Sequence, residues 1–372
     1  MINKIYKIIF FFFILTIIIQ VSCLRPAEER ADLDRKVGKG NAGGVHFDVQ
    51  NGLAAVRKIE AGELELWLQA PGIRIDVETE LGCTSDWILT LKNCMPDAEL
   101  NAVSDEGNEI IIDSITSTIS TELQWSISLP QDDSIIIEIN SPDSDIEDEF
   151  KFAVLSDIQD GIDKVDDIYN LINEYPMIRF VISTGDLVTF GKKSELRKFQ
   201  RKLKILNIPF FSTVGNHELG SEPENWFHYF GRANVNFSFK GVHFSLIDSG
   251  NATIDPDVYK WLKDWLGNAK DDIHIFATHF SPIDPIGLRN GSFASRKEAA
   301  KLLSLLARGN VDVTFYGHVH SFYEFSNAGI PAYISGGGGG VPEQFDGIGR
   351  HFLITDVLSG NKIKSVSVML ID

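Results

Sequence analysis

The sequence predicts a chain in two parts: a small all-β domain of immunoglobulin-like type, then an α/β domain whose two mixed sheets carry helices on their outer faces. Three observations predict this. Short runs of alternating apolar and polar residues fill residues 47–140, a polar acidic segment follows, and after it strand-like and helix-like runs alternate. Period-two alternation is typical of half-buried antiparallel strands, whereas strands alternating with helices are typical of α/β sheets.

The composition sets limits on the function. The 372 residues suffice for two domains, and a hydrophobic content of 44% suffices for their cores. The formal net charge of −18 argues against a nucleic-acid binder, because a phosphate backbone selects basic surfaces. The acidic residues are spread through both halves, so we attribute them to solubility rather than to a partner.

Residues 1–23 resemble an export signal. Lys4 and Lys7 precede an apolar run over residues 8–19, which is shorter than the roughly 20 residues of a membrane span and suits a signal peptide. The segment therefore predicts an exported protein of the bacterial cell envelope.

Cys23 resembles the lipidated cysteine of a bacterial lipobox, although Gln20 stands where an aliphatic residue is usual. We therefore expect a lipoprotein held at the membrane through Cys23, with a plainly secreted protein or an uncleaved anchor as alternatives. Residues 24–45 are polar and are expected to form a flexible tether.

The predicted β-sandwich covers residues 46–141 and has alternating runs such as 63–68, 73–77 and 122–127. It lacks clusters of His, Cys or paired carboxylates in its sequence, so we assign it a structural or substrate-presenting role. Cys83 and Cys94 could close a small disulfide loop in an exported chain, and two unpaired thiols are the alternative.

Residues 142–149 form the predicted linker, which Pro142 opens and acidic residues continue. Residues 150–372 then make up the predicted α/β domain. Its expected strands are 152–155, 179–183, 209–214, 242–247, 273–277, 311–316, 332–334, 352–354 and 363–370, and its expected helices are 165–175, 193–206, 255–266 and 295–306.

Metal-competent side chains follow several of these strands directly. They are Asp157, Asp186, Asn216, His279, His318 and His320. Ligands of open α/β sheets bind at the carboxyl ends of the strands, so we expect these side chains to meet at one edge. A dication would neutralise carboxylates and imidazoles that are otherwise costly there. Mixed oxygen and nitrogen donors suit Mn, Fe or Zn, and the scarcity of cysteine rules out a thiolate site.

These motifs, in this order, resemble those of the calcineurin-like metallophosphoesterases. The matching motifs are Asp157-Ile158-Gln159, Gly185-Asp186, Gly215-Asn216-His217-Glu218, His279 and Gly317-His318-Val319-His320. Gly215-Asn216-His217-Glu218 alone would be equally compatible with an ordinary strand-to-loop turn. The resemblance covers residues 149–372 and implies the metallophosphoesterase-type two-sheet sandwich, flanked by helices.

The resemblance also implies a site with two divalent or trivalent metal ions. One ion would be held by Asp157, Asp186 and His320, and the other by Asp186, Asn216, His279 and His318. Two ions about 3.5–4 Å apart can share a hydroxide that attacks phosphorus directly. His217 would assist the leaving group. Glu218 and Asp248 are candidates to orient imidazoles.

Two positions depart from the family pattern. Gln159 stands where the family usually has His, so we expect the first metal to bind more weakly, or to be Mn or Fe rather than Zn. Thr189 stands where the related purple acid phosphatases have a Tyr ligand, so a purple iron chromophore is not expected.

The sequence thus predicts a hydrolase, a metal-dependent phosphatase or phosphodiesterase, that acts on a small phosphoester. The alternative is a catalytically weakened cell-surface binding protein that retains the fold, and Gln159 is the feature that favours it. Arg289 and Arg296 could reach a phosphate, but surface arginines are an equally good explanation. The glycine run 336–340 could bring backbone close to the metals, with a simple flexible turn as the alternative.

Overall fold

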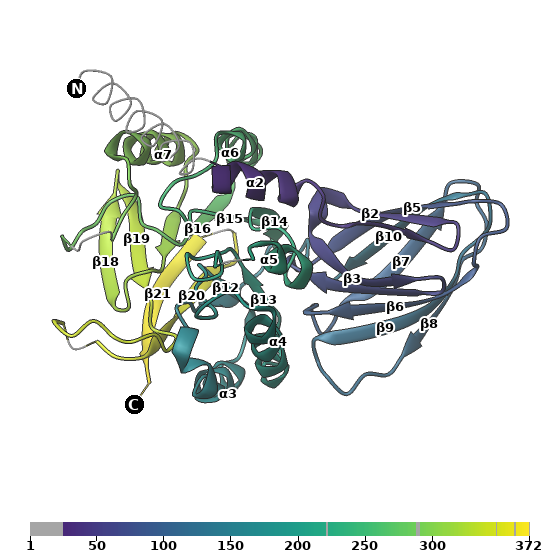
Figure 1. Ribbon diagram of the computed structural model, residues 1–372, viewed down its shortest axis with the longest axis horizontal. Helices are drawn as coiled ribbons and strands as arrows, with labels where there is room; N and C mark the ends of the chain where they lie inside the picture. Colours follow the sequence, from purple (N-terminus) through teal and green to yellow (C-terminus); the bar gives the residue numbers. More distant parts are fainter. Residues whose placement is uncertain (1–24, 221, 288–290, 347, 361, 372) are drawn as a thin grey trace, which may run out of the picture.

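The computed structural model describes residues 25–220, 222–287, 291–346, 348–360 and 362–371. Strands alone make up one end of the molecule, and strands with helices make up the other (Figure 1). The predicted export signal and Cys23 lie outside the described residues. Among the residues described, no helix combines the length and apolar character needed to cross a membrane.

The N-terminal strands form two five-stranded sheets that pack face to face. One has the order β1 (Lys39–Ala42), β2 (Val45–Val49), β5 (Ile73–Thr79), β10 (Ser134–Asn140) and β7 (Glu99–Ser104). The other has the order β3 (Ala54–Glu60), β4 (Glu63–Leu68), β6 (Asp86–Lys92), β9 (Glu122–Ser128) and β8 (Ile111–Ile115). The all-β prediction is confirmed. Its immunoglobulin-like topology stays a prediction, and β4 pairs with β6 in parallel.

The second part contains the predicted pair of mixed sheets, which confirms the fold class. One sheet has the order β13 (Phe210–Ser212), β12 (Ile178–Ser183), β11 (Phe150–Val154), β20 (His351–Leu358) and β21 (Lys362–Leu370). The other has the order β14 (Val235–Phe239), β15 (Val242–Ile247), β16 (Ile273–Thr278), β17 (Val313–Tyr316), β19 (Ile330–Ser335) and β18 (Phe322–Asn327). The helices are α3 (Asp166–Glu174), α4 (Lys193–Lys202), α5 (Glu224–Tyr229), α6 (Pro256–Asn268) and α7 (Arg296–Arg308).

Aromatic rings hold these two sheets together. Phe152 of β11 and Phe180 of β12 each lie 5.3 Å, centroid to centroid, from Phe244 of β15. All three side chains are fully buried. Edge-to-face ring pairs of this kind add about 0.5–1.5 kcal/mol each beyond the burial of apolar area. The interior between the sheets is therefore a packed aromatic core, and the carboxyl ends of the strands are left free for the site.

The segment predicted as a flexible tether is ordered instead, so that prediction is wrong for the described residues 25–45. Residues Arg25–Asp34 form helix α2, which lies across α5 and α6 (Figure 1). Arg30 and Asp34 are buried. Arg30 Nε donates to Asp248 Oδ2 at 2.6 Å, and Asp34 Oδ1 accepts from the backbone amide of Ala233 at 2.7 Å. Polar composition suggested exposure, but these charges have partners about 200 positions away.

The cysteines do not form the predicted disulfide, because Cys83 and Cys94 are both free and buried. They lie beyond opposite ends of β6. A strand rises about 3.3 Å per residue, which separates them by roughly 20 Å or more. A disulfide requires Cα atoms within about 7 Å.

The Arg30–Asp248 pair should contribute strongly to stability. We expect Arg30→Met to lower the free energy of unfolding by about 3–5 kcal/mol, because it leaves the Asp248 carboxylate buried without its cation. Lys39→Met removes the exposed partner of Asp48 and should cost at most about 1 kcal/mol. Urea unfolding of the full chain measures both. Equal costs for the two variants would contradict a buried, stabilising pair.

Candidate metal centre

The strand ends place the predicted ligands at one edge of the two sheets. Strands β11, β12 and β13 run parallel to one another, as do β16 and β17. Each is followed within four residues by a predicted ligand, in the order Asp157, Asp186, Asn216, His279 and His318. The strand ends of the two sheets are joined directly, since the backbone amide of His318 donates to both carboxylate oxygens of Asp157 at 3.1 Å.

One group of donor atoms surrounds Asn216. Its Oδ1 lies 3.0 Å from His279 Nε2 and 3.0 Å from His318 Nδ1. His279 Nε2 is in turn 3.3 Å from Asp186 Oδ2. One donor atom each from Asp186, His279 and His318 lies within 4.8 Å of the others, a spacing that suits a metal ion.

A second group adjoins the first through Gln159. His320 Nε2 is 3.5 Å from Asp157 Oδ1, and Gln159 Nε2 is 3.3 Å from His320 Nε2. Gln159 Nε2 also lies 2.9 Å from Asp186 Oδ2. The structure thus brings every predicted ligand into one continuous cluster.

Backbone carbonyls orient two of the imidazoles. His279 Nδ1 lies 3.0 Å from the Thr184 carbonyl oxygen, and His320 Nδ1 lies 2.7 Å from that of Val341. A carbonyl only accepts, so each Nδ1 carries a proton and each Nε2 is the nitrogen available to a metal. Metal-binding histidines usually have this arrangement. The role of these two carbonyls could not be predicted from the sequence, because every residue has a backbone carbonyl and residue type does not mark the ones that accept.

The cluster attracts positive charge. Burial disfavours the charged form of His279, but the Asp186 carboxylate outweighs it and raises the pKa of His279 to about 9. Burial likewise opposes charge on His320, yet Asp157 raises its pKa to about 9. Burial alone would raise the pKa of Asp186, but His279 brings it down to about 2. A metal cation would supply the positive charge that protons otherwise bring, so the donor set fits a metal site.

Four of the cluster residues have strained backbones. Positive φ angles of 58°, 42°, 54° and 68° occur at Asp157, Gln159, Asp186 and His318. This left-handed conformation costs roughly 1–2 kcal/mol per non-glycine residue. Such strain persists only where surrounding contacts enforce it, and it concentrates at functional sites.

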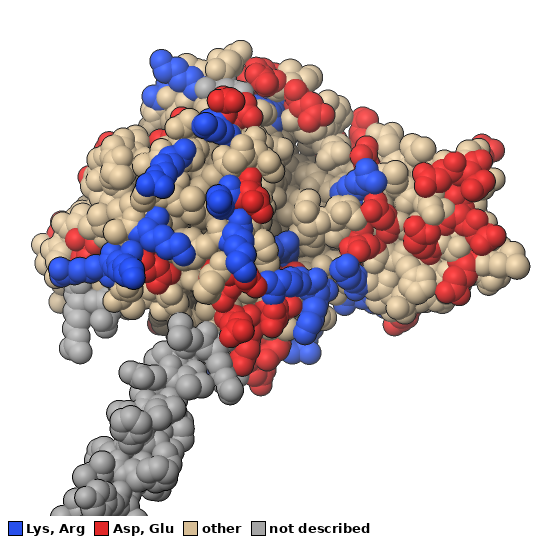
Figure 2. Space-filling model, turned by 90° about the horizontal axis from the view of Figure 1, so that it is seen from above, with Lys and Arg blue, Asp and Glu red and all other residues tan. Residues whose placement is uncertain are grey.

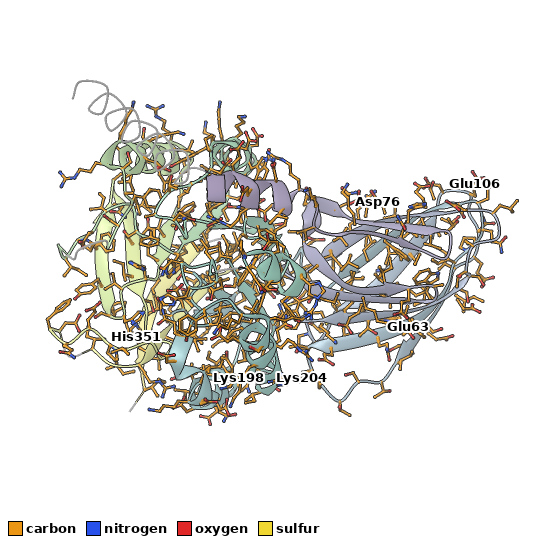
Figure 3. The ribbon with its side chains drawn as sticks, in the orientation of Figure 1. Glu63, Asp76, Glu106, Lys198, Lys204 and His351 are labelled. Carbon is orange, nitrogen blue, oxygen red and sulfur yellow. The ribbon has the colours of Figure 1, made fainter. Side chains whose placement is uncertain are left out.

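Glycines let the backbone approach the carboxylates closely. A Cβ atom at Gly215 would lie 2.1 Å from Asp186 Oδ1, and one at Gly317 would lie 2.6 Å from Asp157 Oδ2. The predicted approach of the glycine run is also seen, because the Gly340 amide donates to the Asp157 carbonyl at 2.7 Å. His351, at the start of β20 (Figure 3), packs against this run, since a Cβ atom at Gly337 would lie 2.2 Å from its Nδ1.

Glu218 and Asp248 act on loops rather than on imidazoles. Glu218 Oε2 accepts from the amides of Asp186 and Gly215, and Oε1 accepts from those of Leu187 and Val188, at 2.7–3.0 Å. Asp248 pairs with Arg30. In the described part of the chain, neither carboxylate accepts a hydrogen bond from a histidine ring, so the prediction that they orient imidazoles is not supported.

His217 faces the opening of the cluster. Its Nδ1 donates to the Thr189 carbonyl at 2.7 Å, its Nε2 lies 3.9 Å from Asp186 Oδ2, and its side chain is 35% exposed.

The Thr189 hydroxyl donates to Asp160 Oδ1 at 2.8 Å, so that side chain is engaged away from the metal cluster. Arg296 is exposed at the start of α7, and Arg289 lies outside the described residues.

Comparison with known proteins gives the family. Residues 150–322 match the family of calcineurin-like phosphoesterases. No curated protein sequence matches the chain. A purple acid phosphatase from yellow lupin (Lupinus luteus) seeds is 13% identical with a TM-score of 0.50, over 81% of this chain and 72% of that one. At this identity the likeness concerns the fold.

Two further solved structures are similar. PhoD is 10% identical with a TM-score of 0.48, over 81% of this chain and 87% of that one. A dimetal phosphatase from Danio rerio is 13% identical with a TM-score of 0.47, over 60% of this chain and 99% of that one. The family match covers the strands that end at the metal cluster, so residues 150–322 are identified as a calcineurin-like phosphoesterase segment.

Proposed function

We propose that the protein is a dinuclear metal-dependent phosphoesterase that hydrolyses a small phosphomonoester or phosphodiester. One observation carries the proposal: aspartate, asparagine and histidine donors from five strand ends converge on one cluster that is buried on one side and half-buried on the other. In this proposal the protein is exported to the cell envelope, and Cys23 anchors it if it is lipidated.

Two overlapping sets of donors would hold the metals. Asp157, Asp186 and His320 form one set, with Gln159 as an additional candidate. Asp186, Asn216, His279 and His318 form the other. Their oxygen and nitrogen atoms suit Mn, Fe or Zn. When bound, these ions would neutralise phosphate charge and lower the pKa of water for attack on phosphorus.

His217 would act at the leaving group. The Thr189 carbonyl holds the proton on Nδ1, so Nε2 is directed toward the open side of the cluster. As the imidazolium, which carries a proton on each ring nitrogen, His217 would donate a proton or hydrogen bond from Nε2 and stabilise charge on the leaving oxygen. Water attacks phosphorus directly in this proposal, with no phosphoenzyme.

A second candidate function is a cell-surface binding protein with weakened catalysis. The observation that favours it is Gln159, whose amide nitrogen donates to Asp186 Oδ2 at 2.9 Å, within the first donor set. The remaining donors favour an enzyme, and measurement of turnover separates the two candidates.

We expect His217→Ala to lower kcat by roughly 10²–10⁴-fold, because it removes a group positioned for proton transfer. The assay is hydrolysis of an aryl phosphate and an aryl diester by Mn-loaded protein. His228→Ala, an exposed histidine on α5, is the matched control and should leave the rate unchanged. Hydrolysis that survives both His217→Ala and exhaustive chelation would contradict the proposal, and absence of hydrolysis in wild type would favour the binding protein.

We expect Gln159→His to tighten binding of the first metal by about tenfold or more, since even groups behind the ligands change affinity 10–100-fold. Imidazole is the better donor for Zn and Fe, and it removes an amide hydrogen bond from Asp186. Metal titration by calorimetry measures the effect. Gln131→His adds an exposed histidine in the N-terminal part and controls for non-specific binding. Equal affinity in wild type and Gln159→His would show that this position does not limit the site.

A further inference from the structure

A polar pocket of about 400 Å³ lies where the two parts of the molecule meet. Arg35, which directly follows α2, and Asn51 of the short helix η1 (Gln50–Gly52) form part of its lining. The remaining lining comes from the second part: Arg232, Asn236 of β14, and Trp261, Trp265 and Asn268 of α6. None of these residues belongs to the metal cluster. Figure 2 views the side on which α2 and α6 lie, where Lys and Arg are scattered among uncharged residues, whereas acidic residues gather at the outer end of the N-terminal strands.

Arg232 is the least satisfied charge in this lining. Its Nη1 donates to the Asn51 carbonyl at 2.7 Å, while its Nε is buried and lacks an acceptor. Within the described part of the chain, no carboxylate oxygen lies within 4 Å of its guanidinium. Asp34 attracts it from farther away, but the oxygens of Asp34 accept from Ala233 and Asn234. Burial lowers the pKa of Arg232, which reflects the cost of this incompletely compensated charge.

A second guanidinium shares the same aromatic surface. The Arg232 and Arg35 guanidinium carbons lie 4.9 and 5.2 Å from the centre of the Trp261 ring. Arg35 has its own carboxylate partners, Asp32 and Asp257. The positive charge that remains uncompensated in the pocket therefore belongs to Arg232. A carboxylate or phosphate placed there would accept a charge-assisted hydrogen bond from the terminal guanidinium nitrogens of Arg232.

Amides and indoles complete the lining. Asn236 Nδ2 donates to the Phe244 carbonyl and to Ser245 Oγ at 3.1 Å, so its Oδ1 is available to accept from a hydroxyl. Asn51 and Asn268 are exposed at the margin. Trp261 and Trp265 are partly buried, and because the guanidinium groups lie over Trp261, the apolar surface for a ligand comes mainly from Trp265. An anion, hydroxyl groups and a ring with an apolar face together satisfy this set of groups.

We propose that this pocket binds an acidic sugar, meaning a hydroxyl-bearing ring with a carboxylate or an ester phosphate or sulfate. The anion pairs with Arg232, the hydroxyls bond to the asparagine amides, and the ring lies against the indoles. The ligand bridges the two parts of the molecule, since Asn51 of η1 lines the pocket from the N-terminal part and α6 lines it from the second part. Binding is independent of the metal cluster and involves no reaction.

The test is titration of the full metal-loaded chain, followed by tryptophan fluorescence and calorimetry. The probes are D-glucuronate, D-glucose 6-sulfate, neutral D-glucose and inorganic sulfate. We expect one or both acidic sugars to bind with a Kd below about 1 mM, and glucose and sulfate to bind at least about tenfold more weakly. Glucuronate binding alone identifies a carboxylate ligand, and glucose 6-sulfate binding alone identifies an esterified one.

Two variants locate the site. Arg232→Gln should weaken binding by about 10–100-fold, the range for losing a charged hydrogen bond. Asn268→Asp places a negative charge at the exposed margin of the pocket and leaves the interior intact. It should weaken the binding of acidic sugars and leave any binding of glucose unchanged. Arg308→Gln, on α7, is the matched control and should change nothing.

The proposal is overturned if neither acidic sugar binds, if glucose binds as tightly as glucuronate, if sulfate binds as tightly as the acidic sugars, or if binding persists in both Arg232→Gln and Asn268→Asp. Hydrolysis of an aryl phosphate by Arg232→Gln should equal that of wild type, so this test succeeds or fails separately from the proposed enzymatic function.

Discussion

Glu218, a buried carboxylate, joins the loops that carry the two central ligands. Its four hydrogen bonds bind the loop after β12, which holds Asp186, to the loop after β13, which holds Asn216. Burial and the neighbouring Asp186 raise the pKa of Glu218 to about 7, and the backbone donors oppose that rise. A carboxylate suits this position because both of its oxygens accept, whereas an amide would turn a donor toward backbone N–H groups. The spacing of the donor side chains therefore depends on a residue that is not itself one of the proposed metal ligands.

The sequence allowed prediction of the site because its geometry follows from a rule about parallel strands. Asp157, Asp186 and His279 each come directly after a buried apolar run, and the carboxyl ends of such runs meet. The strand at residues 242–247 was predicted with the bounds that are observed. Helix α2 was missed, because the burial of Arg30 depends on Asp248, 218 positions away. Composition reports the cost of burying a charge, but it carries no information on whether a distant partner offsets that cost.

Helix α2 thus makes the N-terminal segment part of the second part of the chain. Arg30 holds Asp248, whose amide donates to Asn234 Oδ1 at 2.9 Å. Two residues further on, Gly250 packs so closely that a Cβ atom there would lie 2.9 Å from the Gly215 carbonyl oxygen. The contacts of α2 therefore reach the Asn216 loop through Asp248 and Gly250. After α2 the chain passes through both N-terminal sheets and enters the second part at β11. Loss of α2 would disturb the positions of the donor side chains and lower the stability of the whole fold, since these contacts are continuous.

Gln159 forms the hydrogen bond that holds part of the donor cluster together when no metal ion is bound. Its amide nitrogen donates to Asp186 Oδ2 at 2.9 Å and so supplies part of the positive charge that a metal would bring. For Gln159 to coordinate, the amide must turn so that its oxygen takes the place of this nitrogen, and the hydrogen bond to Asp186 is then lost. An imidazole whose Nδ1 is anchored elsewhere presents a lone pair and requires no such exchange. In the proposed site, a metal at the first position would therefore compete with this hydrogen bond, and a metal at the second would displace the proton that His279, with its pKa of about 9, carries on Nε2.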